Sequence, residues 1–100
     1  MEIQNTPLKD CFIVKPRVFK DERGIFFETF NEKAFNEATG ITTPFIQDNQ
    51  SCSTRGVLRG LHFQTGAMAQ AKLVRVAKGE VLDVVVDLRK DSESFGKSFR

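Results

Sequence analysis

Hydrophobic and polar positions alternate with a period of two along most of the chain, which is the pattern of half-buried β-strands. This alternation predicts single strands over residues 11–15, 45–53, 57–64, 71–77 and 81–89. Residues 17–30 form two further extended segments, folded back at the turn from Asp21 to Gly24. The pair Lys78 and Gly79 is expected to join the last two strands as a hairpin.

Residues 32–38 are the only segment with a helical pattern, because their apolar side chains fall on one face. Asn31 can cap the start of this helix and Gly40 can end it. Several short strands with one short helix, and no alternation of helices with strands, indicate an all-β antiparallel sandwich or barrel. Among these architectures the jelly roll is the leading form.

Composition fits one small domain spanning residues 1–100, with 40% hydrophobic and 28% charged residues. The net charge of +2 and the interleaving of acids with bases argue against nucleic acid as a partner. The sequence has no apolar run long enough for a bilayer and no signal peptide, so we expect a cytoplasmic protein without a membrane partner. Residues 92–100 start to look extended and then stop, so we expect a fragment or a fold that a partner completes.

The single histidine, His62, is the best candidate for proton transfer at neutral pH. Arg59 and Lys72 are nearby cations that would favour the neutral, basic imidazole and an anionic substrate or oxyanion. Strict alternation would place Arg59 and His62 on opposite faces of the strand, although the proposed chemistry requires both in one cavity. Because Gly60 lies between them, a bulge or kink is predicted at that glycine.

Five segments in this order carry a resemblance to a known family: residues 21–28, 47–49, 57–64, 71–75 and 83–89. Together they resemble the dTDP-4-dehydrorhamnose 3,5-epimerases. The resemblance implies a cupin-like jelly roll, a homodimer, and an isomerase with no metal or organic cofactor. Such an enzyme inverts C3 and C5 of dTDP-4-dehydro-6-deoxy-glucose on the way to dTDP-L-rhamnose. Family members are almost twice as long, so residues 1–100 would be the N-terminal part of the jelly roll and inactive alone. Two further catalytic residues would lie outside residues 1–100. One is a tyrosine that acts as the acid on the opposite face of the sugar, and the other is an aspartate that orients the histidine.

The resemblance also implies residue roles. His62 would be the base that removes the proton next to the C4 ketone, and Lys72 would stabilise the enolate oxygen. Arg59 would bind the diphosphate, for which a guanidinium is well suited. The remaining substrate-binding candidates are Arg23, Phe26 and Glu28, which would grip the nucleotide and reach a neighbouring site in the dimer, and Gln47, Asp48 and Asn49.

Asp83 is less defined, because a carboxylate in an apolar strand needs a partner. It could pair with Lys72 or Arg59 in the cavity or, equally, bridge a structural arginine. It is also the candidate within these residues for a carboxylate that orients His62. A metal-binding cupin is disfavoured because one histidine without a His-x-His pair does not build such a site. Two alternatives remain open: a 3- or 5-epimerase of a related dTDP-4-keto-6-deoxyhexose, and a non-catalytic sugar-nucleotide-binding module.

Overall fold

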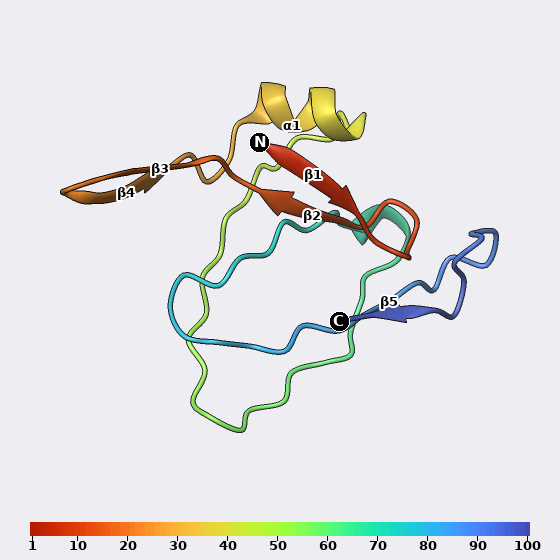
Figure 1. Ribbon diagram of the computed structural model, residues 1–100. Helices are drawn as coiled ribbons and strands as arrows, with labels where there is room; N and C mark the ends of the chain where they lie inside the picture. Colours follow the sequence, from red (N-terminus) through yellow and green to blue (C-terminus); the bar gives the residue numbers. More distant parts are fainter. The chain divides into compact units, whose positions relative to one another are not determined.

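The computed structural model describes residues 1–100, which divide into two compact units (Figure 1). One unit combines residues 1–42 with 76–100, and the other contains residues 43–75. The first unit contains three two-stranded antiparallel sheets and one α-helix. The second contains a single 3-10 turn, η1, at Gly66–Met68. The predicted class, antiparallel β-structure with one short helix, is confirmed in the first unit.

The first sheet pairs β1 (Glu2–Asn5) with β2 (Phe12–Lys15) in antiparallel register, with Ile3 opposite Val14. Strand β2 matches the strand predicted at residues 11–15, whereas β1 was not predicted. Its residues are mostly polar and exposed, so the strand exists because β2 supplies its hydrogen-bond partners.

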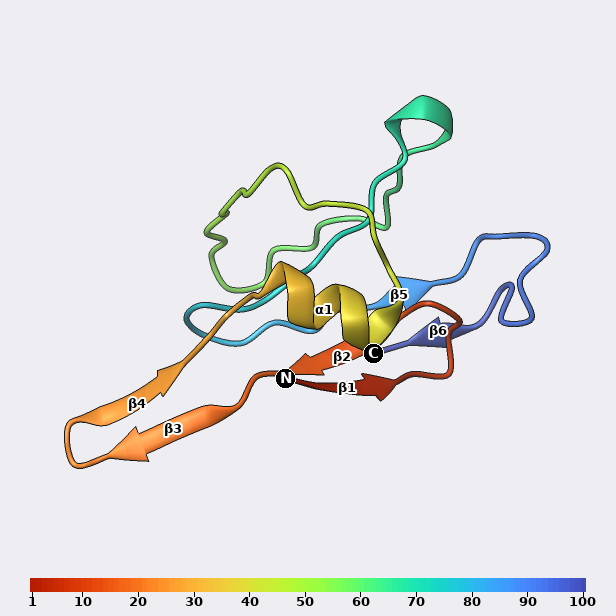
Figure 2. The ribbon, with the colours of Figure 1, turned by 90° about the horizontal axis from the view of Figure 1, so that it is seen from above.

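The second sheet is the hairpin of β3 (Val18–Asp21) and β4 (Gly24–Phe27), which confirms the predicted turn. Gly24 has φ +134°, a conformation that side-chain-bearing residues rarely adopt. All eight strand residues are exposed, and Figure 2 shows the two strands as a ribbon with no other element beside it. The hairpin therefore presents both of its faces outward within its unit.

The helix α1 (Glu32–Thr39) matches the predicted helix, including both of its caps. The side chain of Asn31 accepts a hydrogen bond from the backbone N–H of Ala34 at 2.9 Å, and Gly40 closes the helix with φ +73°. Phe35 is buried and its ring lies 5.8 Å from that of Phe30, between centroids. The buried apolar side chains of this unit are Phe35 and Leu8, and α1 contacts β1.

The strand predictions over residues 45–53, 57–64 and 71–77 are wrong, and the hairpin at Lys78 and Gly79 does not form. Of the strand predicted over 81–89, only β5 (Val85–Val86) forms, paired with β6 (Ser98–Phe99). The apolar alternation is present in these segments, but a strand also needs a neighbouring backbone to pair with. No other part of residues 1–100 pairs with them.

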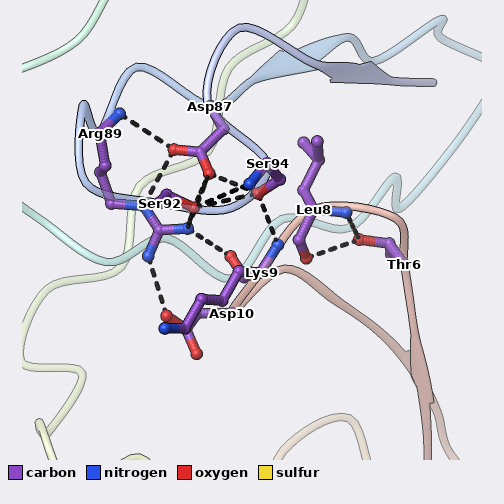
Figure 3. Close-up of polar contacts among 8 residues, drawn as sticks. All are labelled: Thr6, Leu8, Lys9, Asp10, Asp87, Arg89, Ser92 and Ser94. Carbon is purple, nitrogen blue, oxygen red and sulfur yellow. Dashed lines mark hydrogen bonds and ion pairs between the residues drawn. The ribbon is translucent and has the colours of Figure 1, made fainter.

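A polar cluster fastens the loop after β1 to the loop after β5 (Figure 3). The buried carboxylate of Asp87 accepts hydrogen bonds from the Arg89 guanidinium at 2.9 Å and from the hydroxyls of Ser92 and Ser94 at 2.6 Å. The Ser94 hydroxyl in turn accepts from the backbone N–H of Lys9 at 3.0 Å. These bonds hold the pKa of Asp87 well below its usual range, chiefly through Arg89 and then through the two serines.

Candidate functional site

The turn of the β3–β4 hairpin holds Arg23 in place through Asp21. The Asp21 carboxylate accepts hydrogen bonds from Nη2 of Arg23 at 2.6 Å, from Nε at 3.2 Å and from the backbone N–H at 2.8 Å. The guanidinium lowers the pKa of Asp21, and the backbone N–H adds to this effect. The Arg23 side chain is still 86% exposed, so its remaining donors are free to meet an anion.

The other two nucleotide candidates of this hairpin are also exposed. Phe26 is 70% exposed and lies opposite Phe19 across the strand pair. One open hollow is lined by Asp21, Arg23, Gly24, Ile25 and Phe26. A second is lined by Met1, Pro16, Arg17, Phe19 and Glu28. The structure thus brings Arg23 and Phe26 to one hollow and places Glu28 at the other.

In the unit of residues 43–75, the segment Gln47–Asn49 is exposed and irregular. The side-chain amide of Gln47 donates to Oδ1 of Asn49 at 3.4 Å, so the two side chains lie on the same side of the chain. Asp48, between them, makes no hydrogen bond or ion pair. The segment therefore presents one linked pair of amides and one free carboxylate.

Gly60 and His62 are close neighbours in the same unit. Gly60 has φ +104°, so the chain bends at this glycine, but the strand in which a bulge or kink was predicted does not form. A Cβ atom built at Gly60 would lie 3.2 Å from Nδ1 of the His62 ring. The bare backbone of the glycine thus gives the imidazole room to lie against it, a contact that sequence analysis did not foresee.

Arg59 and Lys72, the two cations assigned to this site, lie in the same unit as His62 and are exposed. Neither makes an ion pair within the chain, since all the ion pairs involve Arg23 or Arg89. Their charges are consequently not neutralised by protein carboxylates, which suits a role in binding an anionic substrate.

Asp83 is exposed and makes no hydrogen bond or ion pair, so none of the partners considered for it is present. The buried carboxylate of this segment is instead Asp87, which sequence analysis did not single out. A buried carboxylate could have been recognised here from the spacing Asp87-x-Arg89 followed by Ser92-x-Ser94, because it combines an arginine with two hydroxyls near one carboxylate. The contacts of Asp87 give this carboxylate a structural role.

No group of three or more histidine, cysteine, aspartate or glutamate side chains is arranged to hold a metal ion. The one α-helix of the chain is too short to cross a membrane.

Comparison with known proteins gives a consistent result. The family model for dTDP-4-dehydrorhamnose 3,5-epimerase matches residues 5–100. The epimerase of Shigella flexneri is 56% identical over 97 residues, covering 97% of this chain and 54% of the relative. That of Methanothermobacter thermautotrophicus is 55% identical over 92 residues, covering 92% and 49%. The chain therefore spans about half the length of the curated relatives it matches.

Solved structures agree with the sequence comparison. The crystal structure of dTDP-4-dehydrorhamnose 3,5-epimerase from Elizabethkingia anophelis NUHP1 is 58% identical with a TM-score of 0.94, covering 99% of this chain and 54% of that one. The enzyme from Bacillus anthracis, solved with TDP and PPi bound, is 43% identical with a TM-score of 0.89, covering 98% and 56%. The fold described above is therefore part of a larger epimerase fold, and the chain belongs to the dTDP-4-dehydrorhamnose 3,5-epimerase family.

Proposed function

We propose that residues 1–100 are the N-terminal part of a single-domain, cupin-like jelly-roll dTDP-4-dehydrorhamnose 3,5-epimerase. The observation that carries this proposal is the family match over residues 5–100, together with identities above 50% to relatives of that name. The complete enzyme epimerises C3 and C5 of dTDP-4-dehydro-6-deoxy-glucose by removing protons next to the C4 ketone.

In this reaction His62 acts as the base. A proton next to a ketone is a weak acid, so its removal requires a positioned base and a group that stabilises the enolate oxygen. Lys72 supplies that second group, because a cation stabilises the enolate more than the neutral ketone. Asp83 is a candidate to orient the imidazole in the complete protein, and its exposed carboxylate has no competing partner within residues 1–100.

The nucleotide part of the substrate is bound by charged, aromatic and amide side chains. Arg59 binds the diphosphate, and its lack of an ion pair in the chain supports that role. The other contacts come from Arg23, Phe26, Glu28, Gln47, Asp48 and Asn49. The Bacillus anthracis relative with TDP and PPi bound supports a dTDP-sugar as the ligand. Because nucleotide sugars are made from nucleoside triphosphates, the proposed place of action is the cytoplasm.

We further propose a homodimer in which residues 23–28 reach the neighbouring site. The exposed β3–β4 hairpin supports this, since Phe19, Ile25 and Phe26 are 51%, 63% and 70% exposed. Exposed apolar side chains on one hairpin are typical of surfaces that another chain covers. Light scattering on the full-length protein should give the mass of a dimer, and a monomer would contradict the proposal.

The function is tested with the full-length protein and dTDP-4-dehydro-6-deoxy-glucose in deuterated water. We expect His62→Ala to slow deuterium incorporation at both C3 and C5 by about 10²- to 10⁴-fold. His62→Asn should have a smaller effect. Affinity for dTDP should stay within a few-fold in both variants, because the imidazole acts on the sugar carbons.

The same experiment separates the alternatives. Incorporation at one carbon alone would identify a 3- or 5-epimerase. Binding of dTDP without incorporation in the wild-type protein would identify a non-catalytic binding module. Wild-type exchange by His62→Ala would make His62 structural and overturn the mechanism.

A further inference from the structure

Gly60 is the one glycine at which an added Cβ atom would come within 4 Å of another side chain. A Cβ atom at this position would lie 3.2 Å from Nδ1, 3.4 Å from the backbone N and 3.9 Å from Cε1 of His62. The shortest of these distances is below ordinary van der Waals separation, which is about 3.5 Å or more. The Nδ1–Cε1 edge of the imidazole therefore occupies space that any other residue would fill with its own side chain.

The other glycines show that a positive φ alone does not produce this close contact. Gly56, in the same unit, has φ +85°, and nothing lies within 4 Å of the Cβ atom it would carry. The five glycines outside residues 56–60 also have positive φ and open space at that position. Backbone conformation explains why a glycine stands at each turn. The close approach of a side chain distinguishes Gly60 from the other glycines.

We propose that Gly60 is a positioning residue for His62, holding the imidazole where it abstracts the proton by leaving its Nδ1–Cε1 edge unobstructed. The catalytic consequence rests on the function proposed above. A general base must lie within hydrogen-bond reach of the carbon-bound proton, and a displacement of about 1 Å costs about 100-fold in rate. A methyl group at position 60 requires the ring to move by a few tenths of an ångström, so the expected loss in rate is smaller than 100-fold.

Gly60→Ala is compared with the matched control Gly56→Ala in the full-length protein. Both variants place a methyl group on a backbone with positive φ, but only the first meets the imidazole. We expect Gly60→Ala to slow deuterium incorporation at C3 and C5 at least tenfold more than Gly56→Ala, with dTDP affinity within a few-fold of wild type. The value of kcat should fall in Gly60→Ala, whereas the KM for the dTDP-sugar should stay within a few-fold of wild type. Equal exchange rates in the two variants would overturn the catalytic role.

A double-mutant cycle tests the contact without relying on activity. Gly60→Ala should lower the unfolding midpoint by a smaller amount when His62 is already alanine, because no ring is then displaced. The loss caused by Gly56→Ala should be the same in both backgrounds. Equal losses for Gly60→Ala in both backgrounds, including failure to fold in both, would overturn the positioning role. Wild-type exchange by His62→Ala, with the stability coupling intact, would instead refute the proposed function and leave the contact standing.

Discussion

Asp21 and Arg23 show how a single side chain can prepare another for binding. The Asp21 carboxylate accepts two hydrogen bonds from the guanidinium, which orient it from one side, and a third from the backbone N–H of Arg23. An arginine held in this way loses less conformational entropy when an anion arrives. The Asp21 carboxylate also reduces the net positive charge of the turn, which weakens the attraction for an anion. We expect the gain from orienting Arg23 to exceed this loss.

We expect Asp21→Asn in the full-length protein to raise the KM for the dTDP-sugar about two- to fivefold, because an exposed ion pair that orients the guanidinium makes only a small contribution. The value of kcat should change little, since the turn does not touch the reacting carbons. Steady-state kinetics with a reductase-coupled readout measure both parameters. Glu22→Gln is the matched control, because it makes the same charge change one residue away without an ion pair to Arg23. A lower KM in Asp21→Asn would show that charge outweighs orientation.

Asp87 is a carboxylate whose contacts link it to folding. Its pKa is lowered in the folded protein, so it contributes stability above its ordinary pKa of 3.8. This contribution is lost as the pH falls below that value toward the folded-state pKa.

We therefore expect the difference in unfolding midpoint between wild type and Asp87→Asn to be constant near neutral pH. It should shrink progressively below about pH 4, where the wild-type carboxylate begins to take up a proton in the unfolded state. Thermal unfolding of both full-length proteins from pH 7 to pH 3 measures this. A difference that grows on acidification would contradict the assignment. Asp83→Asn serves as the control, because Asp83 has no hydrogen bond or ion pair.

At the scale of elements, α1 is stabilised by its ends and by one buried ring. Asn31 satisfies a backbone N–H that the first helical turn leaves without a partner. Phe35 is buried and packs on Phe30, and α1 contacts β1. The N-cap and the packing of Phe35 therefore stabilise the same helix.

Replacing Asn31 by alanine should lower the free energy of unfolding by about 1 kcal/mol, which is the usual cost of losing an N-cap acceptor. Asn31→Asp keeps an oxygen acceptor and should remain close to wild type. Urea unfolding of the full-length variants provides the measurement. Equal losses in both variants would show that the cap bond contributes little.

At the scale of the whole molecule, residues 1–100 leave much apolar surface uncovered. Ile46 and Leu58 are 90% exposed, and Leu61 and Leu82 are 75% and 74% exposed. Large apolar side chains exposed in this number favour association of the chain. The chain also contains no tyrosine, and Lys72 is assigned to the enolate oxygen, so no group is available to deliver a proton to the opposite face.

Purified residues 1–100 should accordingly show no net epimerisation in a reductase-coupled assay, and should elute as oligomers or aggregates in size-exclusion chromatography. The full-length enzyme is the positive control. Turnover by a monomer of this length would show that all the proton-transfer groups lie within residues 1–100.

The sequence by itself determined the features that depend on near neighbours. The β3–β4 turn, both caps of α1 and the bend at Gly60 all follow from glycine, from a capping amide, or from alternation over a few residues. The family also followed from the sequence, because ordered motifs carry it. These interactions span about four residues, so they can be recognised without the fold.

Tertiary structure alone decided which alternating segments become strands and which carboxylate is buried. The polar segment β1 is a strand because β2 pairs with it, whereas the apolar residues 57–64 have no partner and form none. Asp87 is buried because Lys9, more than 70 residues away, closes its cluster through Ser94, and Asp83 stays exposed. Ladder hydrogen bonds and burial depend on residues distant in sequence, and local patterning does not specify such partners.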